Sequence, residues 1–158
     1  MATTTKTKKK VELPPNPFLH EILELAGKQR AKAKKVEILQ QYENDALKTI
    51  FIWNFDETVI SVLPSGEVPF KKNEVPVGTD HTSLRREYKH LYNFVKGGND
   101  GLSGLRRETM FIQMLEGLHP EEAEILCLCK DKRLADKYKI TYDVVKQAFP
   151  DIQWGGRS

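Results

Sequence analysis

The sequence predicts a mainly α-helical protein, a compact multi-helix bundle of five to six helices with at most one small β-hairpin. Apolar residues recur at the three- and four-residue spacing of an amphipathic helix over several long segments. Capping residues, glycines and prolines separate these segments. Charged residues make up 30% of the 158 positions and hydrophobic residues 39%, which is typical of a soluble helical protein of one domain.

The chain divides by composition into three parts. Residues 1–15 form a flexible basic N-terminal arm with little to bury, residues 16–152 a single helical domain, and residues 153–158 a C-terminal tail with Trp154 as its one anchor. No apolar run approaches the roughly 20 residues of a membrane span, and the N-terminus lacks the apolar core of a secretory signal. The sequence therefore predicts a protein without a membrane partner.

The first two helices follow the arm. Asn16-Pro17 is a typical helix start, and Gly27 can end the helix that follows. Residues 28–42 form a second helix, whose first half is strongly basic and whose second half is apolar. Cations oppose the dipole at a helix start, which indicates that these charges serve something other than helix stability.

A third helix begins at Asn44 or Asp45, and its many apolar residues predict burial on most sides. After this helix the sequence favours strands and loops over helices. Residues 59–63 and 68–70 are the candidate strands of the small hairpin, and residues 71–80 are an irregular connection.

The fourth helix, residues 83–97, carries a clean apolar stripe, and a glycine-rich loop ends it. Residues 102–130 form a helical hairpin around which the domain is organised. Gly117 can take the left-handed conformation that ends its first helix, and His119-Pro120 begins its second. Thr141 caps the last helix.

Basic side chains supply the candidate functional surface. Arginine and lysine bind phosphates, and arginine pairs do so with a planar fork. The alternative to a binding surface is that these side chains form ordinary solvated helix faces. The pairs Arg85-Arg86 and Arg106-Arg107 would then contact Glu87 and Glu108. The candidate nucleic-acid-binding residues are Lys28, Arg30, Lys32, Lys34, Lys35, Arg85, Arg86, Lys89, Arg106 and Arg107. The arm adds Lys6, Lys8, Lys9 and Lys10.

Known catalytic and cofactor motifs are absent from the sequence. The glycine-rich loop lacks the spacing of a phosphate loop, and no nucleophile motif is present. Cys127, Cys129 and His119 lack the spacing of a zinc site, so the cysteines are expected to be small buried apolar residues. We therefore expect no metal, no cofactor and no enzymatic activity, although a catalytic site assembled only in three dimensions is a third option.

Three segments carry a resemblance to a known family: FIWNFDETVISVLPSGEVPF, LRRETMFIQMLEGLHPEEAEILCLCKDK and ITYDVVKQAFP. Together they resemble a family of small helical proteins of T4-like tailed bacteriophages that has no assigned activity. The resemblance covers roughly residues 18–152 and lies in core and turn residues, so it assigns no site residue. It implies a phage protein that acts in the host cytoplasm or in the virion.

Two functions are compatible with this sequence. The first is a non-catalytic accessory protein that binds DNA or RNA without sequence specificity through its basic helix faces. The second is a protein–protein adaptor or minor structural component that binds a host or phage assembly. The sequence does not show whether the basic segments share one face.

Overall fold

The computed structural model describes residues 13–74 and 81–157. Within them the chain is mainly helical, as predicted, but has more helices than the five to six expected. The elements are α1 (Leu19–Gly27), α2 (Lys32–Gln41), α3 (Asp45–Phe55), α4 (Leu84–Glu87), the 3-10 helix η1 (Tyr88–Phe94), α5 (Gly104–Gly117), α6 (Pro120–Lys130), α7 (Leu134–Tyr138) and α8 (Tyr142–Ala148). The lysine-bearing arm lies outside the described residues.

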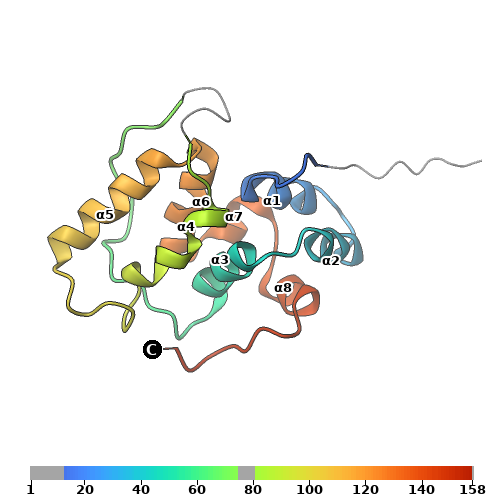
Figure 1. The fold of residues 1–158 in the computed structure, drawn as a ribbon. Coiled ribbons are helices and arrows are strands. Elements are labelled where there is room, and N and C mark those ends of the chain that lie inside the picture. The colour runs from blue at the N-terminus through green and yellow to red at the C-terminus, as the bar shows by residue number, and fades with distance from the viewer. Residues whose placement is uncertain (1–12, 75–80, 158) are drawn as a thin grey trace, which may run out of the picture.

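The arrangement places α3 and α6 at the centre of the bundle (Figure 1). Helices α1, α2 and α8 lie on one side of this centre, and α5 lies on the other. Buried side chains from all of these helices form one continuous core, in which Phe51, Phe94, Phe111 and Phe149 are the largest of the fully buried members. No helix among the described residues is long and apolar enough to cross a membrane.

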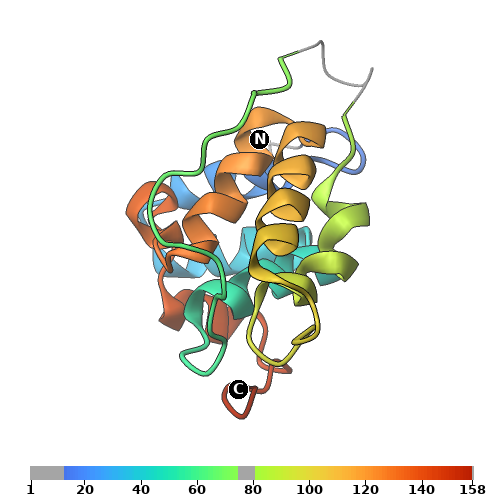
Figure 2. The same ribbon diagram turned by 90° about the vertical axis from the view of Figure 1, so that its left-hand side faces the viewer.

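The predicted hairpin of α5 and α6 is confirmed, and the two helices lie side by side in Figure 2. The imidazole of His119 accepts a hydrogen bond from the Glu121 amide, and Pro120 is the first residue of α6. Gly117 ends α5, but the predicted left-handed conformation is wrong. The Gly117 carbonyl instead accepts from the Thr82 amide at 2.7 Å, and Leu118 continues in an extended conformation.

The predicted fourth helix is broken. It forms a single α-helical turn, α4, and then the tighter η1. At its C-terminal end the carbonyl oxygens accept from distant groups: Asn93 from the Arg107 guanidinium at 2.9 Å and Phe94 from the Val62 amide at 3.0 Å. These long-range partners satisfy the carbonyls at the end of η1, and sequence periodicity cannot anticipate them.

The predicted hairpin of residues 59–63 with 68–70 does not form among the described residues. Ser61 instead pairs with Val95 in an isolated antiparallel bridge. The chain beyond it runs along α6 (Figure 2). Lys130 at the end of α6 holds this segment through hydrogen bonds to the carbonyls of Pro64 and Gly66.

A single buried carboxylate joins three helices. Glu122 in the first turn of α6 is fully buried. Its two oxygens accept hydrogen bonds from the amide of Leu19 at 2.8 Å and from the amide of Leu84 at 2.9 Å. These are the first residues of α1 and α4, so Glu122 supplies the acceptor that helix starts need. It also explains why α1 begins at Leu19 rather than at the predicted Asn16-Pro17.

Candidate nucleic-acid interface

The start of α2 concentrates positive charge. Residues 28–35 hold five cationic side chains and no acidic one. Ala31 precedes the helix and offers no side-chain acceptor, and the first turn has no acidic residue. The exposed amides of a helix start carry partial positive charge and bind anions such as phosphate. The backbone and the side chains of this segment therefore favour the same kind of ligand.

Helix α8 packs against α2, and Lys139, which precedes α8, extends this basic region. Lys35 donates a hydrogen bond to the backbone carbonyl of Lys139, an exposed residue whose φ is 58°. Lys32 pairs with Asp143 in the first turn of α8, and Lys34 pairs with Glu37 at 3.6 Å. All of these ion pairs are exposed, and such pairs contribute only about 0–1 kcal/mol, so a phosphate can replace them. We call this region the α2–α8 surface; it comprises Lys28, Arg30, Lys32, Lys34, Lys35 and Lys139.

The predicted arginine pairs have two different roles. Arg107 is buried, and its guanidinium donates to the carbonyls of Asn93, Asn99 and Leu102 at 2.8–3.1 Å. Arg85 is half-buried, and its Nε donates to the Pro17 carbonyl at 2.9 Å. Both arginines hold neighbouring segments together, and the buried Arg107 does not present its guanidinium group to an external phosphate.

The remaining predicted cations, Arg86, Lys89 and Arg106, are exposed. They belong to α4, η1 and α5. Figure 1 shows α2 and α5 at opposite ends of the molecule, with α3 between them. The ten predicted residues therefore do not form one surface: five are on the α2–α8 surface, Arg85 and Arg107 make internal hydrogen bonds, and three lie elsewhere.

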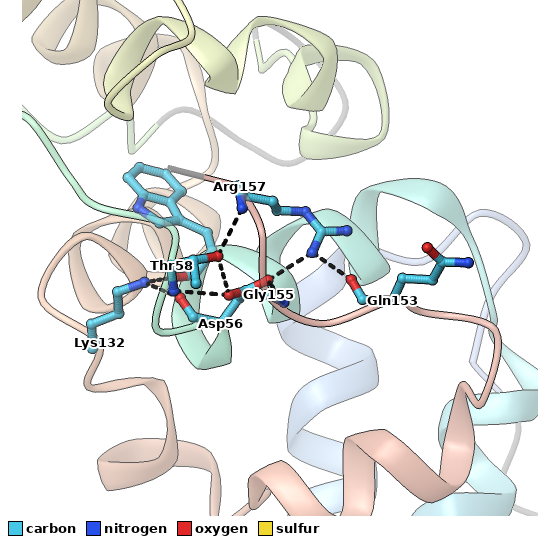
Figure 3. A network of polar contacts seen from close by, with 7 residues as sticks. Asp56, Thr58, Lys132, Gln153, Gly155 and Arg157 are labelled. Carbon is cyan, nitrogen blue, oxygen red and sulfur yellow. Dashed lines mark hydrogen bonds and ion pairs between the residues drawn. The ribbon is translucent and has the colours of Figure 1, made fainter.

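A cleft of about 780 Å³ opens where α3 ends, and the C-terminal tail lines it. Its anchor is Asp56, whose side chain is almost fully buried. One oxygen of Asp56 accepts from the amide and hydroxyl of Thr58, and the other accepts from the Gly155 amide at 2.9 Å and from Arg157 at 2.7 Å (Figure 3). Burial would raise the pKa of Asp56, but these hydrogen bonds lower it to about 2.

Lys132 completes this network from the connection between α6 and α7. Its φ is 61°, and its ammonium group donates to the carbonyls of Trp53 and Asp56 at the end of α3 (Figure 3). Burial lowers the pKa of Lys132. A cation at a helix end complements the helix dipole, so Lys132 stabilises the end of α3.

Three histidines that are distant in sequence meet beside the start of α6. The ring of His119 lies 4.6 Å from that of His20 and 5.4 Å from that of His81, measured between centroids. Burial lowers the pKa of both His20 and His119, and the adjacent imidazoles lower it further. Sequence reasoning missed this cluster because nothing in the spacing of these residues indicates that they meet.

His20, His119 and Glu121 place possible metal-ligand atoms within 4.8 Å of one another. Two features oppose metal binding in this conformation. The His20 and His119 rings are stacked at 26°, so their in-plane lone pairs cannot both point at an ion about 2 Å away. The Nδ1 atom of His119 also accepts the Glu121 amide hydrogen. The cluster is therefore explained by packing and by helix capping.

Comparison with known proteins gives one result. Residues 22–136 match the model of a family of unknown function, DUF6433. No curated protein and no solved structure matches the chain. Because the match covers most of the helical domain, from α1 to α7, the chain belongs to the DUF6433 family of unknown function.

Proposed function

We propose that this protein binds nucleic acid through the α2–α8 surface, by phosphate contacts and without sequence specificity. The observation that carries the proposal is the coincidence of five cations with an uncapped helix start. Phosphate contacts supply most of the affinity of non-specific binding, and they need no base-reading geometry. The proposed role is binding, not turnover.

Two kinds of phosphate contact are expected on this surface. The backbone amides at the start of α2 would hold one phosphate, because they lack a side-chain cap. Lys28, Arg30 and the exposed Lys139 would contact its neighbours along the strand. Binding would replace the exposed pairs of Lys32 with Asp143 and of Lys34 with Glu37, so the affinity should depend steeply on salt.

The biological setting is also a proposal, and it rests on the resemblance to proteins of T4-like phages. In that setting the chain is an accessory protein that meets phage or host nucleic acid in the host cytoplasm, or that is carried in the virion.

Fluorescence polarisation with labelled duplex and single-stranded oligonucleotides at two salt concentrations tests the proposal. We expect dissociation constants of roughly 10⁻⁴–10⁻⁶ M near physiological salt and tighter binding below it. Binding weaker than about 1 mM at low salt would contradict the proposal, since it would be weaker than ordinary non-specific binding.

Two triple variants with the same change of charge locate the interface. The substitutions Lys32→Glu, Lys34→Glu and Lys35→Glu should weaken binding more than about tenfold and reduce the salt dependence, by roughly one phosphate contact for each lysine. The matched control carries Arg86→Glu, Lys89→Glu and Arg106→Glu and should bind almost as the unmodified protein does. The opposite pattern would place the interface on α4 and α5.

The alternative role is a protein–protein adaptor. The observation in its favour is the exposure of Leu105 (79%) on α5 and of Tyr92 (51%) on η1. Single exposed apolar residues are common, so this is the weaker case. A pull-down with and without nuclease separates the two roles: partners that survive nuclease treatment support the adaptor, and partners lost with the nucleic acid support binding through phosphates.

A further inference from the structure

The cleft beside Asp56 has aromatic walls. Phe55, Tyr142 and Trp154 line it, and they come from α3, α8 and the C-terminal tail. The Tyr142 ring meets the Trp154 ring edge to face at a centroid distance of 5.0 Å, and it lies 6.2 Å from the Phe55 ring. Tyr142 is still 40% exposed, so these contacts leave part of its ring open to a ligand.

The same cleft offers hydrogen-bonding groups beside these rings. Asn54 lines it and is only 5% exposed. Its Oδ1 accepts from the Leu134 amide at 3.0 Å, while no described residue accepts from its amide nitrogen. Glu57, which also lines the cleft, is an exposed acceptor. A ligand that fits has a flat aromatic face and an edge with both donors and acceptors.

The charge of the cleft does not exclude a ligand that carries phosphate. The Asp56 carboxylate is paired with Arg157 and accepts from Thr58 and Gly155, so little of its charge remains uncompensated. Lys132 lines the cleft, and the Lys146 ammonium lies over one face of the Tyr142 ring, 5.1 Å from its centroid. Cations are therefore placed both inside the cleft and over Tyr142, and a base that stacks on Tyr142 takes the other face or displaces the exposed Lys146 side chain.

The cleft adjoins the α2–α8 surface. Tyr142 in the cleft is followed directly by Asp143, whose carboxylate pairs with Lys32 of α2. A strand whose phosphates lie on the start of α2 would therefore have its next nucleotides close to Tyr142.

We infer that this cleft holds one unpaired nucleobase of a bound strand, stacked on Tyr142 and hydrogen-bonded to the amide of Asn54. The inference rests on the proposed function, because the α2–α8 surface must bring the strand to the cleft. Stacking on aromatic side chains tolerates any base, which agrees with binding that does not depend on sequence. The preferred ligand is then a duplex with a single-stranded end, not a blunt duplex.

The test compares a blunt duplex with the same duplex carrying a short single-stranded overhang. The unmodified protein should bind the overhang duplex about tenfold more tightly, which corresponds to the stacking of one base. Tyr142→Ala should abolish this preference and leave blunt-duplex binding unchanged. Tyr92→Ala, which removes another exposed tyrosine that does not line the cleft, should preserve the preference.

The outcomes separate the two proposals. Failure to bind either duplex contradicts the proposed function itself. Equal affinity of the unmodified protein for both duplexes contradicts the binding of a base in the cleft. A preference for the overhang duplex that survives Tyr142→Ala also contradicts it, and so does an equal loss of affinity for both duplexes in that variant. Free adenosine monophosphate provides a further arm: quenching of Trp154 fluorescence by the free nucleotide, at concentrations where overhang DNA saturates, would overturn the assignment to a strand in favour of a free nucleotide.

Discussion

Replacing Glu122 should destabilise the fold far more than replacing any other acidic residue of α6. In Glu122→Ala the amides of Leu19 and Leu84 lose their acceptor inside the protein. Each buried donor without a partner costs about 1–3 kcal/mol, so the free energy of unfolding should fall by about 4 kcal/mol. Glu122→Gln keeps one acceptor oxygen and no longer buries a charge, so its loss should be about half as large.

Urea denaturation followed by circular dichroism measures these losses. Glu124→Gln, an exposed position on the same helix, is the control and should change stability by less than about 0.5 kcal/mol. The reasoning is refuted if Glu122→Ala costs less than about 1 kcal/mol, or if Glu122→Gln costs as much as the alanine variant.

The pH dependence of Glu122 provides a second measurement. Burial raises its pKa above the ordinary 4.5 despite the two amide donors. The associated stability is therefore complete below the ordinary pKa and is lost as pH rises through the folded-state pKa. Glu122→Gln cannot titrate, so its disadvantage relative to the unmodified protein should be larger below that folded-state pKa than above it.

Three further predictions concern other buried contacts. Asp56→Asn should lower the free energy of unfolding by about 1–3 kcal/mol at neutral pH. Because the Asp56 pKa is lowered to about 2, the unmodified protein should lose this contribution as pH falls from the ordinary 3.8 towards 2. The prediction is contradicted if acid lowers the free energy of unfolding equally in the unmodified protein and in Asp56→Asn. Burial lowers the pKa of His20, so the protein should lose stability as pH falls below 6.5, and His20→Phe should reduce that loss in urea titrations at two pH values. Gly27→Ala would place a methyl group 2.1 Å from the Tyr138 carbonyl oxygen and should cost about 1–3 kcal/mol, whereas Gly104→Ala, which meets nothing within 4 Å, should be nearly neutral in the same denaturation assay.

Local chemistry predicted several features of the fold correctly. Asn44 accepts from the Leu47 amide, Thr141 accepts from the Val144 amide, and Pro120 begins α6. Each of these signals acts within four residues, so sequence spacing contains it. The α5–α6 hairpin followed for the same reason, since apolar periodicity and a helix stop are both local.

The predictions that were wrong or missing concern contacts between residues that are distant in sequence. The C-terminal end of η1 is held by Arg107 and Val62, neither of which is near it in the chain. A sequence signal did exist for Arg107, because it lies four residues before the buried Phe111, on the same face of α5. Glu122 likewise precedes the buried Leu126 by four residues. A charged residue on an apolar stripe indicates an internal partner, not a surface contact.

The candidate site was predictable only in part. The basic composition of residues 28–35 is visible in the sequence, but its separation from Arg86, Lys89 and Arg106 requires the arrangement of α2, α4 and α5. The aromatic cleft combines side chains from α3, α8 and the tail, and no spacing along the chain brings these together.

The bond between Asp56 and Arg157 joins positions 101 residues apart, nearly two thirds of the chain. During translation from the N-terminus, α3 therefore emerges long before the residues that bond to it. The wall of the cleft that contains Trp154 can close only after the chain has been synthesised as far as Arg157. A chain terminated just before Gln153 should still assemble its helices, but it would lack this wall and any ligand that depends on it.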